Sequence, residues 1–155
     1  MIRPAIPADV PRLRAIQLAA LAEPWDGLLD PAIDGPQVVL VAVPGVDADA
    51  GGGTDRQPVG YAVAIPEDGT AYLAELAVAA PHRRNGHGAA LVRALCARLA
   101  AAGHTTLRLT VRETDRGARA FYDELGFAVQ SLVPDQYEDA DALVLTRSLQ
   151  ASSSN

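Results

Sequence analysis

The stretch LAVAAPHRRNGHGAAL, residues 76–91, decides the fold of this chain. An apolar run leads into a polar loop with two glycines, and apolar residues at helical spacing follow from Ala89. This order predicts a buried strand that passes through a basic loop straight into a helix. The start of such a helix carries unpaired N–H groups and a partial positive charge, so it can bind a phosphate group.

The loop favours phosphate binding, although other interpretations exist. Gly86 and Gly88 leave room for a pyrophosphate to approach the main chain, and both are expected to have a positive φ. Arg83 and Arg84 add positive charge. A dinucleotide-binding fingerprint would need a third glycine where Leu91 stands. A Walker loop needs a lysine, but all 13 basic residues are arginines. Spacing alone does not exclude a plain strand-to-helix turn that contains two glycines and binds no phosphate.

Length and composition narrow the class of protein. A chain of 155 residues can bury a core as one domain, which we expect over residues 1–149 with a frayed tail at 150–155. One cysteine, Cys96, and three histidines argue against disulfides and metal sites, and Cys96 is expected in the core. The net charge of −6 argues against nucleic acid and leaves room for an amine-bearing partner. Without a membrane or targeting segment, a soluble cytoplasmic protein is expected.

Periodicity along the chain predicts alternating helices and strands. The expected strands are residues 1–5, 38–43, 59–65, 71–78, 105–112, 127–133 and 142–149. The expected helices begin at Asp9, at Ala89 and at Thr114 or Asp115, and residues 25–36 are expected to form a second short helix or an irregular connection. Residues 44–57, rich in Gly and Asp, are expected to form a flexible loop. The order predicts an α/β domain with a mixed, mostly antiparallel sheet and helices on both faces.

Four segments together resemble the GNAT family, the Gcn5-related N-acetyltransferases. Residues 83–88, RRNGHG, match the Q/R-x-x-G-x-G/A loop that binds the acyl-CoA pyrophosphate, and residues 118–127, ARAFYDELGF, match the A-x-x-x-Y-x-x-x-G-F signature. Residues 2–10 look like the opening strand and first helix of the family, and residues 76–81 like its fourth strand. Residues 111–113 and 137–140 also resemble the bacterial ribosomal-protein N-terminal acetyltransferases.

The resemblance implies a twisted sheet that is splayed between its fourth and fifth strands, with acyl-CoA in the gap. It assigns the cofactor contacts to Leu76, Ala77, Val78, Arg83, Arg84, Asn85, Gly86, His87, Gly88, Ala89 and Asp115. Asp115 stands where the family often has asparagine. Trp25 is expected either to line the acceptor pocket or to anchor the core.

Acetyl transfer to an amine needs a proton acceptor for the ammonium and a proton donor for the leaving thiolate. By the resemblance Tyr122 is the donor, although its apolar pattern also fits a core aromatic residue. The ribosomal-protein enzymes carry a glutamate at the position of Thr110, which cannot act as a base. Glu75, acting through water, is therefore the expected base, and Glu113 comes next.

The resemblance implies an N-acetyltransferase that moves the acetyl group of acetyl-CoA to a primary amine by direct attack, without a metal. The expected acceptor is a small amine (a polyamine, an amino acid or an aminoglycoside) or a peptide N-terminus. The alternative is a non-catalytic acyl-CoA-binding module of the same fold. A homodimer is the default expectation, with no nucleic-acid or membrane partner.

Overall fold

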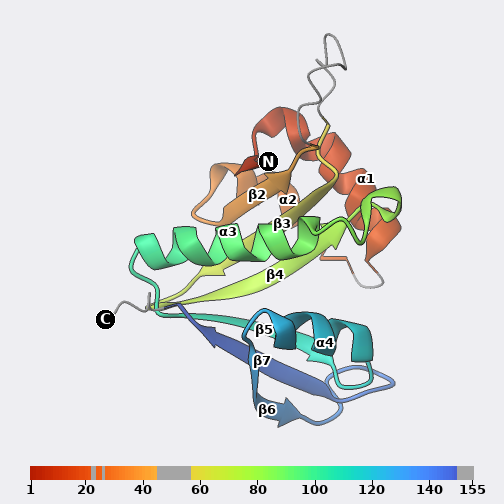
Figure 1. The fold of residues 1–155 in the computed structure, drawn as a ribbon, viewed down its shortest axis with the longest axis vertical. Coiled ribbons are helices and arrows are strands. Elements are labelled where there is room, and N and C mark those ends of the chain that lie inside the picture. The colour runs from red at the N-terminus through yellow and green to blue at the C-terminus, as the bar shows by residue number, and fades with distance from the viewer. Residues whose placement is uncertain (22–23, 26, 45–56, 150–155) are drawn as a thin grey trace. The chain divides into compact units, whose positions relative to one another are not determined.

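The computed structural model describes residues 1–21, 24–25, 27–44 and 57–149. The predicted loop of residues 44–57 lies largely outside these ranges, and the predicted tail of residues 150–155 lies wholly outside them. The chain forms two compact units (Figure 1). Unit 1 comprises Met1–Ile65 and Ala74–Leu95, and unit 2 comprises Pro66–Leu73 and Cys96–Asn155. The expected single domain over residues 1–149 stays a prediction.

Helices and strands follow in the predicted order. The elements are β1 (Ile2–Pro4), the 3-10 turn η1 (Pro7–Asp9), α1 (Val10–Ala20), α2 (Leu29–Asp34), β2 (Val38–Ala42), β3 (Gly60–Pro66), β4 (Thr70–Val78), the 3-10 turn η2 (Ala80–His82), α3 (His87–Ala101), β5 (Thr106–Arg112), α4 (Arg116–Glu124), β6 (Ala128–Val133) and β7 (Ala142–Ser148). No helix within the described residues is long and apolar enough to span a membrane.

The strands form one mixed sheet in the order β1-β2-β3-β4-β5-β7-β6. β1–β2, β2–β3, β5–β7 and β6–β7 pair antiparallel, and β4 pairs with β5 in parallel. The parallel register joins residues 70–72 to residues 106–108. The predicted mixed, mostly antiparallel α/β class is confirmed.

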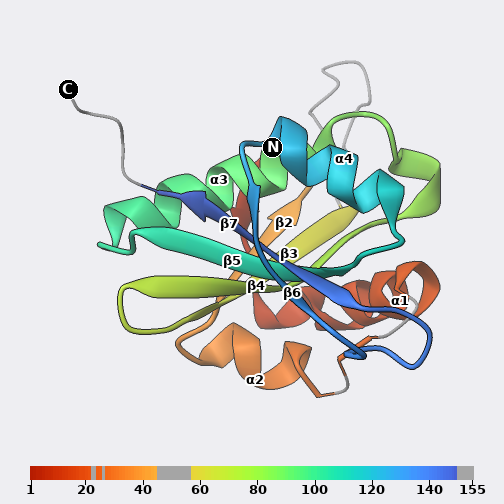
Figure 2. The ribbon, with the colours of Figure 1, turned by 90° about the horizontal axis from the view of Figure 1, so that it is seen from below.

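Unit 1 is layered, because its strands bury side chains on both faces. In Figure 2, α1 and α2 lie on one face of β2, β3 and β4, and α3 lies on the other. The face toward α1 and α2 holds a core cluster, which consists of Leu13, Ile16, Leu28, Leu29, Ala32, Val39, Val41, Val43, Tyr61, Val63 and Ala77. Leu40 and Ala62 alternate with these strand residues, so their side chains belong to the opposite face of the sheet, and both are fully buried. Helices on both faces, as predicted, therefore occur in this unit.

Unit 2 is built on the β5–β7–β6 ladder. The predicted alternation of β5 is confirmed, because Leu107, Leu109 and Val111 are buried while their neighbours are not. Cys96 is buried, as expected. β6 forms the edge of the sheet and exposes Val129.

Gly60 permits a close approach between β3 and β4. A Cβ at this position would lie 2.9 Å from the Ala77 carbonyl oxygen and 3.1 Å from Val78 Cγ2. Real Cβ atoms do not approach carbonyl oxygens this closely, so the end of β4 would have to shift. Glycine at position 60 therefore helps to place the end of β4, from which the RRNGHG loop departs.

Gly60→Ala should lower the free energy of unfolding by about 1–3 kcal/mol, because it overpacks a closed site. Gly117→Ala is the matched control. A Cβ at Gly117 meets only Asp115 Oδ1 at 3.8 Å, so helix propensity should raise stability by up to about 1 kcal/mol. Urea unfolding of both variants tests the pair, and equal effects of the same sign would contradict the packing described for Gly60.

Candidate functional site

The loop between β4 and α3 turns sharply at two residues with left-handed backbone. Gly86 has φ +82°, which glycine adopts at little cost. Arg84 has φ +66°, which is uncommon for a side-chain-bearing residue and tends to occur at functional turns. The sequence pattern pointed to Gly86, but nothing in it pointed to the backbone of Arg84. Together the two residues bring the chain into the first turn of α3.

The loop and the start of α3 present unpaired main-chain donors. Ala90 N donates to Gly86 O at 3.0 Å, which is the first hydrogen bond of the helix. Within the described residues, no main-chain N–H group from Arg84 to Ala89 has a hydrogen-bond acceptor. Such a row of donors, at the positive end of a helix of 15 residues, is an anion-binding arrangement. It comprises the N–H groups that the resemblance assigns to the pyrophosphate.

Gly88 requires a correction. The sequence suggested that both glycines of the loop need a positive φ. Gly88 is instead the second residue of α3, with helical backbone, and it is absent from the left-handed residues. Any residue can adopt helical backbone in the first turn of a helix, so position 88 does not require glycine for its conformation. Position 86 does, because its φ is positive.

The side chains of the loop differ in how firmly they are held. Arg83 Nε donates to Val78 O at 2.9 Å, which ties the loop to the last residue of β4. Arg84 and Asn85 are exposed. The rings of His82 and His87 meet edge to face with centroids 6.4 Å apart. Burial, followed by the charge of His82, lowers the pKa of His87, so its neutral form dominates at neutral pH.

The predicted strand contacts lie at the end of β4. Ala77 is buried and belongs to the core cluster of unit 1, whereas Leu76 and Val78 are half-buried. The carbonyl of Val78 already accepts the Arg83 side chain, so that group is engaged within the protein itself. The main chain of these residues otherwise leads directly into the loop.

Glu75 lies near the middle of a hydrogen-bonded cluster in unit 1. Its carboxylate is 6% exposed and accepts Gln17 Nε2 at 2.9 and 3.2 Å, Trp25 N at 2.7 Å and Tyr61 Oη at 2.9 Å. These donors are neutral, and within the described residues no cation pairs with Glu75. Glu75 is therefore neither a solvated nor an arginine-paired carboxylate.

Two members of this cluster could not be found from the sequence. Tyr61 is fully buried on β3, and burial followed by the negative charge of Glu75 raises its pKa far above the ordinary value. It therefore stays a hydrogen-bond donor. Gln17 lies on the buried stripe of α1 and is 5% exposed. Trp25 is 47% exposed, so the expectation of a core anchor is wrong for its ring.

Tyr122 lies on α4 in unit 2, and its ring packs edge to face on Phe121 and Phe127. The residue is 9% exposed, and its hydroxyl has no hydrogen-bond partner among the described residues. The hydroxyl oxygen is not among the fully buried, unpartnered atoms, so it keeps some access to solvent. Burial, followed by the charge of Asp115, raises the pKa of Tyr122, which keeps the phenol protonated.

The remaining candidates have structural contacts of their own. Asp115 caps α4, because its Oδ1 accepts Ala118 N at 3.0 Å, as one of the two predicted caps. Glu113 follows β5, and its carbonyl accepts Arg119 Nη1 at 3.0 Å. Thr110 is half-buried within β5. The structure thus brings Glu75 together with Gln17, Trp25 and Tyr61 in unit 1, while Tyr122 and Asp115 belong to unit 2.

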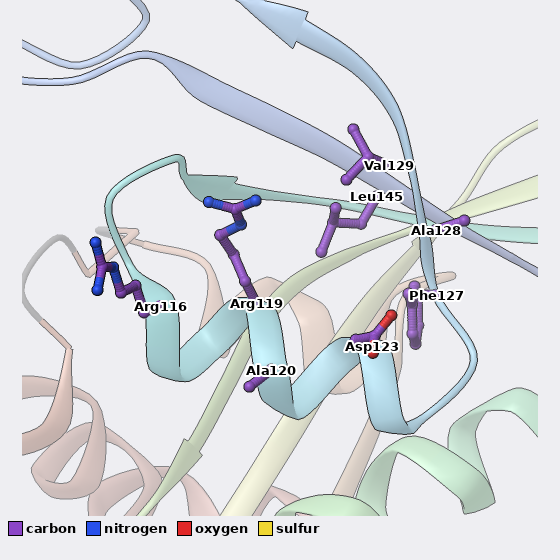
Figure 3. Close-up of a pocket in the computed structure, with 8 residues that line it drawn as sticks. All are labelled: Arg116, Arg119, Ala120, Asp123, Phe127, Ala128, Val129 and Leu145. Atoms are coloured by element: carbon purple, nitrogen blue, oxygen red, sulfur yellow. The ribbon is translucent and has the colours of Figure 1, made fainter.

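Unit 2 also holds an open cavity of about 430 Å³ that sequence reasoning missed. Figure 3 shows its lining, which consists of Arg116, Arg119, Ala120, Asp123, Phe127, Ala128, Val129 and Leu145. Arg119 rises from α4, and its Nη1 donates to Glu113 O. None of the predicted site residues lines this cavity. Its charged side chains are exposed, and none is a buried polar group that needs a ligand, so the loop before α3 remains the candidate site.

Comparison with known proteins agrees with this geometry. The profile of the family described as Acetyltransferase (GNAT) family matches residues 28–127, and the chain belongs to that family. The match includes β4, the RRNGHG loop, α3 and α4. A search of curated protein sequences finds no match to this chain.

Solved structures of the same fold cover nearly the whole chain. The ribosomal-protein-S18-alanine N-acetyltransferase of Escherichia coli is 24% identical with a TM-score of 0.78, covering 100% of this chain and 97% of its own. An aminoglycoside 6'-N-acetyltransferase complexed with coenzyme A is 19% identical with a TM-score of 0.80, covering 99% of both chains. Arabidopsis thaliana NAA60 in complex with acetyl-CoA is 18% identical with a TM-score of 0.81, covering 96% and 97%. At these identities the likeness shows the fold.

Gly86→Ala should weaken coenzyme A binding at least tenfold and lower the melting temperature only slightly. A Cβ there meets nothing within 4 Å, so the cost is the left-handed φ, about 1–2 kcal/mol, and relief of that strain turns the N–H groups away. Calorimetric titration with coenzyme A and thermal unfolding measure the two effects.

Gly69→Ala is the matched control, since Gly69 has φ +71° and also has nothing within 4 Å. It should show the same loss of stability with unchanged affinity. Equal coenzyme A affinities of wild type, Gly86→Ala and Gly69→Ala would contradict the prediction that the loop before α3 binds coenzyme A.

Proposed function

We propose that this protein is an acetyl-CoA-dependent N-acetyltransferase that acts on a primary amine. One observation carries the proposal: the unpaired main-chain N–H groups from Arg84 to Ala89 at the start of α3. A pyrophosphate offers several anionic oxygens to such a row of donors. Membership of the GNAT family and neighbours solved with acetyl-CoA or coenzyme A support the same substrate.

In this proposal the loop holds the pyrophosphate and β4 orients the rest of acetyl-CoA. The main chain of Leu76, Ala77 and Val78 lies beside the pantetheine arm. Arg84, Asn85 and His87 belong to the same segment and add polar side chains beside the phosphates. Gly88 and Ala89 contribute main-chain N–H donors. Arg83 acts indirectly, because its side chain ties the loop to Val78 O. Asp115 contributes mainly by capping the helix that carries Tyr122.

The transfer itself needs no covalent enzyme intermediate. The neutral amine nitrogen attacks the thioester carbonyl carbon, the C–S bond breaks, and the thiolate leaves with the bonding electrons. Tyr122, kept protonated by burial, donates its proton to that sulfur. Once the nitrogen has bonded to the carbonyl carbon it carries a positive charge, and it loses a proton through water to the carboxylate of Glu75, which neutral donors hold in place. Water then restores the protonation state of both residues.

The acceptor is proposed only as a class: a small amine or a peptide N-terminus. Neighbours of the same fold include enzymes named for ribosomal-protein alanine and for an aminoglycoside. A chain with net charge −6 attracts cationic acceptors of either kind. A cytoplasmic location and, as the resemblance implies, a homodimer remain part of the proposal.

Thiol release from acetyl-CoA with a panel of amines tests the proposed function. We expect at least one of spermidine, kanamycin and an alanine-terminated peptide to accelerate release well above hydrolysis. The alternative, a non-catalytic acyl-CoA-binding module, predicts tight coenzyme A binding with no acceleration by any amine. Coenzyme A binding alone does not separate the two, because both would be stabilised by the ligand.

Tyr122→Phe should lower turnover by roughly 10²–10⁴, the usual contribution of one general acid, while the melting temperature changes little. The ring and its packing on Phe127 remain, and the lost hydroxyl has no partner among the described residues. Tyr72→Phe is the control for removing a phenol hydroxyl elsewhere and should keep full turnover. Turnover of Tyr122→Phe within a few-fold of wild type would mean that Tyr122 is a core residue only.

A further inference from the structure

The open cavity of unit 2 is lined on one side by one face of α4. Four lining residues follow one another at spacings of three, one and three positions, so their side chains lie along a single face of the helix. They are Arg116, Arg119, Ala120 and Asp123. Figure 3 shows Val129 and Leu145 across the cavity from them. The volume of about 430 Å³ is in the range of small-molecule pockets, so the cavity is large enough for a ligand.

The wall opposite α4 is apolar. Val129 of β6 is the direct partner of Leu145 on β7, so the two side chains lie on the same face of the sheet. Leu145 and Phe127 are buried, whereas Val129 is 56% exposed. An apolar group that covered Val129 would remove this surface from water and gain free energy. The cavity therefore combines an apolar wall with a charged helix face.

The charges on this face of α4 do not stabilise the helix that carries them. Arg116 is its first residue and Asp123 lies in its last turn, and both charges oppose the helix dipole. Arg119 and Asp123 are four residues apart, a spacing at which opposite charges pair. Among the described residues, however, no ion pair or hydrogen bond engages the Asp123 carboxylate or the Arg116 guanidinium. Arg119 donates only to Glu113 O. These groups are therefore available to a ligand.

We propose that this cavity binds a free α-amino acid with an apolar side chain. The guanidinium groups of Arg116 and Arg119 bind its carboxylate, and Asp123 binds its ammonium group. The side chain of the ligand covers Val129 and Leu145. A ligand with both charges fits better than a simple anion, which Asp123 would repel, or a simple cation, which the arginines would repel. None of the residues assigned to acetyl transfer lines the cavity, so this inference is independent of the proposed function.

Titration of the whole chain with L-leucine, followed by amide chemical shifts in NMR, tests the site. We expect saturable shifts that are largest within residues 116–129 and at Leu145, with a Kd of about 1 mM or below. Leucinamide lacks the carboxylate and 4-methylpentanoate lacks the ammonium group. Each should bind roughly tenfold more weakly, because each loses a charged hydrogen bond. Glycine, which lacks the apolar side chain, should also bind more weakly than leucine.

Variants of the two charged groups without partners give the second measurement. Arg116→Gln and Asp123→Asn should each weaken leucine binding about three- to tenfold. Both should keep or raise the melting temperature, because each removes a charge that opposes the helix dipole, so a loss of binding is not a loss of folding. Arg98→Gln on α3 and Glu124→Gln on α4 are the matched controls. They remove the same charges from exposed positions outside the cavity and should leave the affinity unchanged.

Three results would overturn the inference. Leucine produces no saturable shifts, or the largest shifts fall outside residues 116–129 and Leu145. Leucinamide or 4-methylpentanoate binds as tightly as leucine, which would exclude recognition of both charges. Asp123→Asn and Glu124→Gln weaken binding equally, which would be a general effect of charge and not of the cavity. Thiol release with the amine panel is measured without leucine, so either proposal can fail while the other stands.

Discussion

The candidate site depends on one constraint of the main chain, the turn from Arg84 to Gly86 that leaves N–H groups without acceptors at the start of α3. Left-handed backbone at both residues stops the loop from satisfying its own donors. Such donors are costly to leave unpaired unless water or an anion meets them. The position of β4, set partly by the close approach at Gly60, and the bond from Arg83 to Val78 maintain this turn.

The two residues assigned to proton transfer have opposite environments. Glu75 accepts hydrogen bonds from neutral donors on β3 and α1, whereas Tyr122 packs among aromatic rings. Burial raises the pKa of Tyr122, so the phenol keeps the proton that the proposed step requires it to donate.

The sequence predicted the element order, the sheet class and the family, because these depend on periodicity and on a glycine spacing that few loops share. It predicted the phosphate loop but assigned a positive φ to Gly88, since two glycines in a loop look alike until the start of the helix is known. It missed the roles of Tyr61 and Gln17. In the sequence, Tyr61 occupies an apolar strand position, and Gln17 is a single polar residue on an apolar helix face. Neither pattern indicates a role, because the contact of both residues with Glu75 exists only in the folded chain.

The central claim is that the main-chain N–H groups from Arg84 to Ala89 bind the pyrophosphate of acetyl-CoA. Amide chemical shifts recorded by NMR during a titration with coenzyme A test it most directly, because they report on each N–H group separately. We expect the largest changes at residues 84–89, and we expect inorganic pyrophosphate to move the same amides in the same direction. Saturation by coenzyme A with these amides unmoved, or with the largest changes at the cavity lined by Arg116 and Arg119, would contradict it.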